Sequence, residues 1–256
     1  MLEIIPLPAL KDNYIWLLKN KISRHVAIID PSETKPVLDK IKSESLIPIA
    51  ILITHHHWDH VGGILGIIKQ YDIPVYTPKT ESVTGSTDLV SEGDIVALPE
   101  LNINLEILDV PGHTSGAIAY YTNSIVFSGD TLFAGGCGRI FEGTSSQMYA
   151  SLTKFKTLPA NTLLYCGHEY TVKNLKFAAS IEPQNTFIHK RLEHAQRSRK
   201  SNRPTVPTTL LEESRSNPFL RCEEPNVISA ASDFFGKNLN NAVDVFTAIR
   251  QWKDNF

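Results

Sequence analysis

The sequence predicts a mixed α/β (α+β) fold in which two β-sheets pack together under covering helices, followed by a helical region. Residues 25–76 alternate between apolar runs and helical patterns, which is typical of βαβ units. Residues 94–127 instead form short alternating runs separated by turn residues, which predict β-hairpins. After Tyr170 only helical patterns remain. We therefore predict two domains, residues 1–170 and residues 171–256, and the alternative is a tail of helices that packs on the first domain.

The first half of the chain supplies the βα units. Residues 1–18 predict two strands split by a polar turn, and residues 25–30 predict a third. The apolar run at residues 49–53 lacks polar alternation, so it predicts a buried parallel strand. Gly62 and Gly63 permit a close approach of the backbone to a ligand. The remaining elements expected here are helices over residues 33–43 and 61–71 and a parallel strand over residues 73–76.

The second half predicts short strands and then helices. Thr144-Ser-Ser-Gln147 is typical of a capped helix start, and this helix should run to residue 157. The other expected strands cover residues 94–98, 103–110, 117–121, 124–127 and 163–166. The other expected helices cover residues 171–180, 186–201, 208–214 and 242–253.

Composition excludes several classes of protein. The chain has 256 residues, of which 42% are hydrophobic and 20% charged, as in ordinary globular domains. A net charge of −2 gives no overall field that favours nucleic acid or an anionic membrane, and the apolar runs are too short to span a bilayer. Residues 1–10 lack a basic segment, and the three cysteines are too scattered for a disulfide framework. We therefore expect a cytoplasmic protein without a signal peptide, and a monomer, although the charge favours no oligomeric state.

The most informative stretch follows a predicted buried strand and reads Thr54-His-His-His-Trp-Asp-His60. Residues two apart in an extended segment point the same way, so His55 and His57 can aim at one point. Asp59 and His60 follow where the chain turns into a helix, and they can face a second point nearby. Imidazole and carboxylate groups are preferred zinc ligands. An expression tag would lie at a terminus and would not follow a buried strand, so we predict metal binding.

Three further candidate ligands each follow a glycine at the end of an apolar run: His113, Asp130 and His168. The ends of strands at one edge of a sheet are where α/β folds place their sites. By ligand count the candidates divide into two sets, with Asp130 left over as a carboxylate that can bridge two cations. The first set is His55, His57 and His113, and the second is Asp59, His60 and His168.

These motifs, Thr-His-His-His-Trp-Asp-His with the later Gly-His-Thr, Gly-Asp-Thr and Gly-His-Glu, resemble those of the metallo-β-lactamase superfamily. Within it the chain resembles the hydroxyacylglutathione hydrolases, or glyoxalase II enzymes, over essentially its whole length. The resemblance implies a four-layer αββα sandwich followed by a helical substrate-binding domain. It also implies two divalent metal ions, zinc first with iron or manganese as alternatives, held by the two ligand sets and bridged by Asp130.

The implied reaction is hydrolysis of a glutathione thioester, S-D-lactoylglutathione, to glutathione and D-lactate, the second step of methylglyoxal detoxification. Two metal ions about 3.5 Å apart share a water and lower its pKa, which yields a hydroxide near neutral pH that attacks the thioester carbonyl. A metal would stabilise the oxyanion that develops. Asp59 and Asp130 are the protein groups assigned to catalysis, and Asp59 is expected to orient the nucleophile. Cys166 is interpreted as a small core residue rather than a nucleophile.

The resemblance also implies contacts with glutathione, whose carboxylates suit cationic side chains. Arg250 and Lys253 share a helix face, and by spacing alone they would be a solvated helix end. The Arg-x-x-Lys-Asp-x-Phe ending, however, resembles the glutathione-binding terminus of the family. Arg139 matches a position that is lysine in some relatives, and Tyr170 matches a substrate-contacting tyrosine. Phe141 matches a position that is tyrosine in some members, so one hydroxyl contact is in doubt.

Other functions on the same fold fit the sequence less well. A lactonase is one such alternative hydrolase. A nuclease should have a basic tract, and a β-lactamase should carry an export signal. A persulfide dioxygenase would need only two histidines and an aspartate around one iron. A binding protein without activity should lack ligands, and none is missing. His56 and Trp58, between the ligands, are expected to point away from the metals into the ligands' surroundings or the core.

Overall fold

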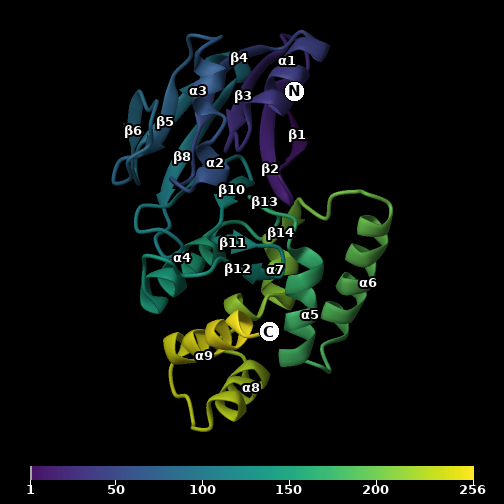
Figure 1. The fold of residues 1–256 in the computed structure, drawn as a ribbon. Coiled ribbons are helices and arrows are strands. Elements are labelled where there is room, and N and C mark those ends of the chain that lie inside the picture. Colours follow the sequence, from purple (N-terminus) through teal and green to yellow (C-terminus); the bar gives the residue numbers. More distant parts are fainter. Residues whose placement is uncertain (1) are drawn as a thin grey trace.

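The computed structural model describes residues 2–256, and it confirms the predicted four-layer sandwich with a helical region at its C-terminal end (Figure 1). The first sheet has the strand order β1 (Leu2–Ala9), β2 (Asn13–Asn20), β3 (His25–Ile29), β4 (Ile47–Leu52), β5 (Val75–Pro78) and β6 (Asp88–Val90). The second has the order β14 (Thr208–Thr209), β13 (Leu163–Cys166), β10 (Ile125–Gly129), β9 (Ile118–Thr122), β8 (Ile103–Asp109) and β7 (Ile95–Leu98). A hairpin of β11 (Leu132–Phe133) and β12 (Gly136–Cys137) follows β10.

The first sheet is buried on both faces. In β2, Trp16 and Leu18 point into the core between the two sheets, whereas Ile15 and Leu17 point to the opposite face. That outer face is covered by two helices, α1 (Thr34–Glu44) and α3 (Ile64–Ile68). Because alternate side chains of a strand face opposite sides, a strand buried on both sides is apolar throughout. This explains why β2 and β4 lack polar alternation.

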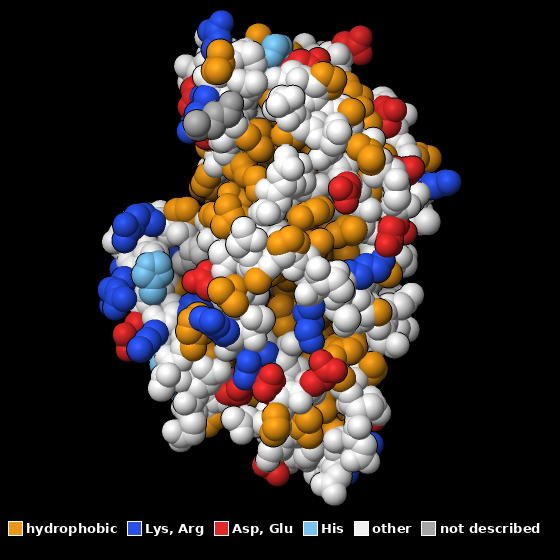
Figure 2. All heavy atoms as spheres, turned by 180° about the vertical axis from the view of Figure 1, so that it is seen from behind, with side chains coloured by type: hydrophobic (Ala, Val, Ile, Leu, Met, Phe, Trp, Pro, Cys, Tyr) orange, Lys and Arg blue, Asp and Glu red, His pale blue; other side chains and the backbone are white. Residues whose placement is uncertain are grey.

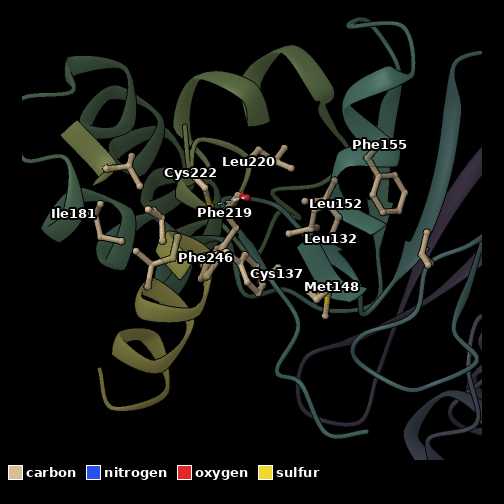
Figure 3. Packing of buried hydrophobic residues seen from close by; sticks show 14 of the residues in the cluster. Leu132, Cys137, Met148, Leu152, Phe155, Ile181, Phe219, Leu220, Cys222 and Phe246 are labelled. Atoms are coloured by element: carbon tan, nitrogen blue, oxygen red, sulfur yellow. Dashed lines mark hydrogen bonds between the residues drawn. The ribbon is translucent and has the colours of Figure 1, made fainter. Parts of the chain in front are cut away.

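The outer face of the second sheet packs against helices that follow the β11–β12 hairpin in the sequence. These are α4 (Ser145–Thr157), α5 (Thr171–Ile181), the 3₁₀ turn η2 (Pro218–Leu220) and α9 (Ala242–Asp254). Figure 3 shows Cys137 of the β11–β12 hairpin among Phe219 of η2 and Phe246 of α9. The helices after Tyr170 thus share a core with the second sheet, and β14 from the same region pairs with β13.

The prediction of a single helix over residues 61–71 was wrong. The chain instead forms two short helices, α2 (Trp58–Val61) and α3, with a break at Gly62 and Gly63. A Cβ atom at Gly62 would lie 2.6 Å from the carbonyl oxygen of Ser32, and one at Gly63 would lie 2.6 Å from that of Pro31. The two glycines therefore permit a close approach between backbone segments, and not the expected approach to a ligand.

Some C-terminal elements also differ from the expected ones. The helix expected over residues 208–214 begins as strand β14 and continues as α7 (Leu210–Ser216), which Thr209 caps. Helix α8 (Pro225–Phe235) was not expected, although Pro225 opens it and Gly236 ends it in the left-handed conformation, as is typical of helix termini. The expected helix after residue 186 is α6 (Thr186–Lys200). The short strands β6, β11, β12 and β14 and the 3₁₀ turn η1 (Pro99–Leu101) were also not expected.

Positive charge is distributed unevenly over the surface, although the net charge is −2. Lys and Arg side chains gather on the flank that α6 occupies, where the last turn of the helix carries Arg197, Arg199 and Lys200 (Figure 2). Among the helices of residues 2–256, none combines the length and the apolar character that a bilayer span requires.

Candidate metal centre

The seven predicted metal ligands come together where strands of both sheets end. His55 and His57 follow β4, and Asp59 and His60 lie in α2. The remaining ligands follow strands of the second sheet: His113 after β8, Asp130 after β10 and His168 after β13. Residues up to 113 positions apart in the sequence therefore converge on one edge of the sandwich.

The first ligand set consists of His55, His57 and His113. One ring nitrogen from each lies within 4.8 Å of the others. The Nε2 atom of His113 is 3.0 Å from the Nδ1 atom of His57. His55 and His113 are buried, and His57 is partly exposed at the edge of a cleft. Three imidazoles arranged in this way could hold one metal ion.

The second set consists of Asp59, His60 and His168, whose ligand atoms also lie within 4.8 Å of one another. The Oδ2 atom of Asp59 is 3.4 Å from Nε2 of His168 and 3.7 Å from Nε2 of His60. Both imidazoles are buried. The mixture of carboxylate and imidazole donors suits a second divalent ion.

Asp130 lies between the two sets. Its Oδ2 atom is 3.6 Å from Nε2 of His113 in the first set and 3.2 Å from Nε2 of His168 in the second. Its Oδ1 atom is 3.4 Å from Nε2 of His60. A carboxylate in this position can bridge two cations.

Three buried polar atoms of the centre fit bound cations. Nε2 of His55, Nε2 of His60 and Oδ1 of Asp130 have no hydrogen-bond partner among residues 2–256. Buried polar atoms in folded proteins nearly always have a partner, so unpaired atoms in one cluster need an explanation. Two cations coordinated by these side chains would pair all three atoms. The donor set therefore fits a binuclear metal site.

The candidate ligands of the centre differ in ionisation. Burial holds the pKa of His55 well below its ordinary value, so this imidazole is neutral and its lone pair is free. Burial would raise the pKa of Asp130, but the neighbouring His168 and His60 outweigh it and hold this pKa well below the usual range. Metal ligands must be deprotonated, and His55 and Asp130 meet that condition. Burial would lower the pKa values of His168 and His60, but Asp130 outweighs it, raising the pKa of His168 to about 9 and that of His60 well above its ordinary value. Binding of a second cation would therefore displace protons from these two imidazoles.

Sequence reasoning missed the residues that orient the ligands of the second set. Oδ2 of Asp30 lies 3.0 Å from Nδ1 of His60, and Oδ1 of Asp12 lies 2.9 Å from Nδ1 of His168. These contacts fix the imidazoles so that Nε2 faces the centre. A signal was present, because each aspartate stands where an apolar run ends, a position that packing alone does not explain.

The other ligands are oriented in the same manner. The Oγ1 atom of Thr54 lies 3.0 Å from Nδ1 of His55, and the Nδ2 amide of Asn13 donates to Oδ2 of Asp59 at 3.0 Å. Nδ1 of His113 donates to the backbone carbonyl of Arg139 at 2.7 Å. A backbone acceptor leaves no signal in the sequence, since every residue carries one.

The residues between the ligands behave differently from one another. His56 points away from the centre, as expected, with Nδ1 3.0 Å from Glu81 and Nε2 3.0 Å from Glu142. The expectation of buried contacts was wrong for Trp58, which is 71% exposed and lines the cleft beside the centre. Trp58 is the first residue of α2, and His60 is the residue of this helix that is buried. Cys166 is buried, and burial raises its pKa to about 12, so its thiol is not a nucleophile at neutral pH.

A cleft of about 750 Å³ opens beside the two ligand sets. It brings together ligand residues with all five predicted substrate contacts, which are Arg139, Phe141, Tyr170, Arg250 and Lys253. Lys173 and Asn174 of α5 and Asp254 of α9 also line it, and sequence reasoning did not single them out.

The predicted contacts nearest the metal ligands are aromatic. Tyr170 stacks on His168, whereas Phe141 is 61% exposed and presents its ring edge-on to His57 and His113 at 5.5 Å and 5.3 Å between centroids. These rings form part of the wall between the centre and the open cleft.

The predicted cationic contacts differ in exposure. Arg139 is exposed, with Nε 3.3 Å from Oδ1 of Asp254. The ammonium of Lys253 lies over the ring of Phe177, and burial together with the neighbouring charge of Arg250 lowers its pKa to about 7. Arg250 is only 7% exposed and donates to acceptors of this chain.

Comparisons with known proteins agree with this geometry. Residues 12–168 match the family model for the metallo-β-lactamase superfamily, and residues 169–256 match that for the hydroxyacylglutathione hydrolase C-terminus. The hydroxyacylglutathione hydrolase of Nitrosomonas eutropha is 48% identical over 256 residues, which cover 100% of both chains. That of Alkalilimnicola ehrlichii is 48% identical over 254 residues, which cover 99% of both chains.

The chain belongs to the hydroxyacylglutathione hydrolase family. A solved structure on the same fold, TTHA1623 in a di-iron-bound form, has a TM-score of 0.58 and 25% identity, and the match covers 85% of this chain and 100% of that one. The metallo-β-lactamase fold and the two His/Asp clusters together indicate a binuclear metal site in this member of the family.

Proposed function

We propose that this member of the hydroxyacylglutathione hydrolase family hydrolyses S-D-lactoylglutathione to glutathione and D-lactate, the second step of methylglyoxal detoxification. The observation that carries the proposal is a complete set of seven histidine and aspartate side chains beside a cleft that is lined with cationic residues. The carboxylates of a glutathione thioester suit such cations. Relatives that match along the full length and are named hydroxyacylglutathione hydrolase support hydrolysis of a glutathione thioester.

We propose zinc for both metal positions, with iron as the second candidate because TTHA1623 is described in a di-iron-bound form. His55, His57 and His113 would hold the first ion, Asp59, His60 and His168 the second, and Asp130 would bridge them. When bound, the two cations would supply an acidified water and electrostatic stabilisation of the thioester carbonyl. Asp59, whose Oδ2 accepts from Asn13, is proposed to orient the attacking water. The buried ligands exclude bulk water from one side of the reacting atoms.

We propose that the helical region, residues 171–256, is a substrate-binding domain. Its Lys253 would bind a glutathione carboxylate together with Arg139, and Arg250 and Tyr170 would complete the contacts. Phe141 would contribute apolar area but no hydrogen bond. We place the enzyme in the cytoplasm, because glutathione keeps thiols reduced there and Cys137, Cys166 and Cys222 form no disulfide. We also propose that it is a monomer.

The test is hydrolysis of S-D-lactoylglutathione, followed by the loss of thioester absorbance. Turnover should disappear after treatment with a chelator and return when Zn²⁺ is added back. The control is a protein with Asp130→Asn, which should retain the fold by circular dichroism but lose most turnover. Absence of turnover by protein that holds two metal ions per chain would refute the proposed function.

A further inference from the structure

The last helix, α9, reaches the metal centre through a chain of hydrogen bonds. We infer that Arg250 is a positioning residue for the metal ligand His113: together with Asp254 it fixes the segment Cys137–Arg139, whose Arg139 carbonyl orients the imidazole. This inference rests on the metal site of the proposed function but not on the identity of the substrate.

The first link joins His113 to Arg139. Nδ1 of His113 donates to the carbonyl oxygen of Arg139 at 2.7 Å, which fixes the tautomer and leaves Nε2 without a proton. That Nε2 atom faces Nδ1 of His57 and Oδ2 of Asp130. Hydrogen bonds of this kind determine both the orientation and the basicity of a ligating imidazole. The position of one backbone carbonyl therefore determines how well His113 can bind a metal.

The second link joins this segment to α9. Nη1 of Arg250 donates to the carbonyl of Cys137 at 3.0 Å and to that of Gly138 at 3.4 Å. Nη2 of Arg250 donates to Oδ1 of Asp254 at 3.0 Å, and the same oxygen lies 3.3 Å from Nε of Arg139. Arg250 thus holds the backbone of the segment, while Asp254 holds the side chain at its end.

The segment has little room to move between these partners. A Cβ atom at Gly138 would lie 1.9 Å from the carbonyl oxygen of Asp130 and 3.1 Å from Nδ1 of His113, so only glycine fits against the centre. On the other side, Cys137 is buried in the cluster that contains Phe219 and Phe246 (Figure 3). A displacement of α9 would therefore be transmitted to the Arg139 carbonyl.

The alternative is that Arg250 serves only to bind a substrate carboxylate. Its guanidinium is buried over the ring of Phe219, 5.1 Å from the ring centroid. Nη1 and Nη2 already donate to acceptors of this chain, whereas the buried Nε has no partner among residues 2–256, so the guanidinium keeps a donor for a substrate carboxylate and the two roles are compatible. The two roles predict different effects of substitution on metal affinity, which makes them separable.

The experiment is a titration of the apoprotein with Zn²⁺ in competition with a chromophoric chelator. Loss of an orienting partner of a ligand costs roughly 10- to 100-fold in metal affinity, and for Arg250→Met, one step further away, we expect about tenfold for one of the two ions. Arg250→Lys keeps the charge but lacks the fork that reaches two acceptors, so its affinity should also fall. The matched control is Lys253→Met, which removes a cation from the same cleft without touching Cys137–Arg139 and should bind both ions as the wild type does.

A second variant separates the proposed effect from a general loss of stability. Asp254→Asn leaves the bonds from Arg250 to Cys137 and Gly138 in place, so it should fold as the wild type does and lose metal affinity in the same direction but less. The imidazole N–H resonance of His113 in the apoprotein should shift in both variants, whereas a general loss of stability would not single out this histidine. If Arg250→Met and Asp254→Asn both bind the two ions with wild-type affinity, the inference about Arg250 is overturned, but the proposed metal site is not. Failure of the wild type to bind two ions would overturn the proposed metal site as well.

Discussion

Tyr170 stacks on His168 with 4.7 Å between ring centroids and an angle of 4° between the ring planes. Nδ1 of the same imidazole bonds to the carboxylate of Asp12. His168 is therefore fixed both in its plane and along its hydrogen bond, so a predicted substrate contact also supports a predicted metal ligand.

The two roles of Tyr170 can be separated by substitution. Tyr170→Phe keeps the stacked ring and removes the hydroxyl, so we expect unchanged metal affinity and a KM for S-D-lactoylglutathione that is higher by about fivefold, the equivalent of one hydrogen bond of about 1 kcal/mol. Tyr170→Ala removes the ring and should also weaken the second metal position. Steady-state kinetics and zinc titration of both variants test this. Equal metal affinity in Tyr170→Ala and the wild type would show that the stack does not support His168.

Lys253 should make substrate binding depend on pH. Its pKa in the folded protein is about 7, against an ordinary value of 10.5, because burial and Arg250 disfavour the charged form. A carboxylate needs the protonated ammonium, so KM should rise as the pH increases through about 7, with kcat less affected. Lys253→Met should have a higher KM at pH 6 and should lose this pH dependence.

The same shift has a consequence for stability, with the opposite direction to the usual case of a paired lysine. The folded state disfavours protonated Lys253, which lowers the free energy of unfolding. This loss of stability is fully present below pH 7, where Lys253 is protonated in both states, and it fades between pH 7 and 10.5 as the folded state releases the proton. Lys253→Met should therefore raise the thermal midpoint at pH 6 more than at pH 9. Differential scanning calorimetry at the two pH values checks this, and an equal change at both would contradict the assignment.

Asp30 should be needed for metal retention, although it is not a predicted ligand. It accepts from Nδ1 of His60 and from the amide of Thr54, and it is buried. For Asp30→Asn we expect roughly 10- to 100-fold weaker metal binding. The amide has only one acceptor oxygen and no charge, so it cannot accept from both His60 and Thr54 as the two carboxylate oxygens do. The control is Asp39→Asn, whose side chain is exposed on α1. This substitution should leave the metal content after dialysis unchanged. Wild-type metal content in Asp30→Asn would count against the role of this carboxylate.

Phe141 offers a test by gain of function. It is exposed at the cleft, with its ring edge-on to His57 and His113. Phe141→Tyr adds one hydroxyl without changing the ring, so KM should fall by about fivefold if the hydroxyl reaches the substrate. The value of kcat should stay within twofold, roughly, because no metal ligand is touched. An unchanged KM would place the glutathione moiety elsewhere in the cleft.

The fold and the convergence of the ligands were predictable because their signals are local. His55 to His60 form one continuous motif after an apolar strand, and each remaining ligand follows a glycine at a strand end. The break at Gly62–Gly63 was not predicted, because its cause is the backbone of residues 31–32, which meets the glycines only in the folded chain. The surroundings of Arg250 were not predictable either, since it bonds a carbonyl 113 residues earlier.

The contacts of Asp12 and Arg250 place both ends of the chain at the metal centre. Asp12, in the turn between the first two strands, holds His168 across 156 positions, and Arg250, in the last helix, holds the carbonyl of Cys137 across 113 positions. Every predicted metal ligand precedes α9 in the sequence, so during synthesis on the ribosome the segment beside His113 emerges before the helix that holds it. A nascent chain that lacks α9 should therefore hold its metal less tightly than a chain that contains it.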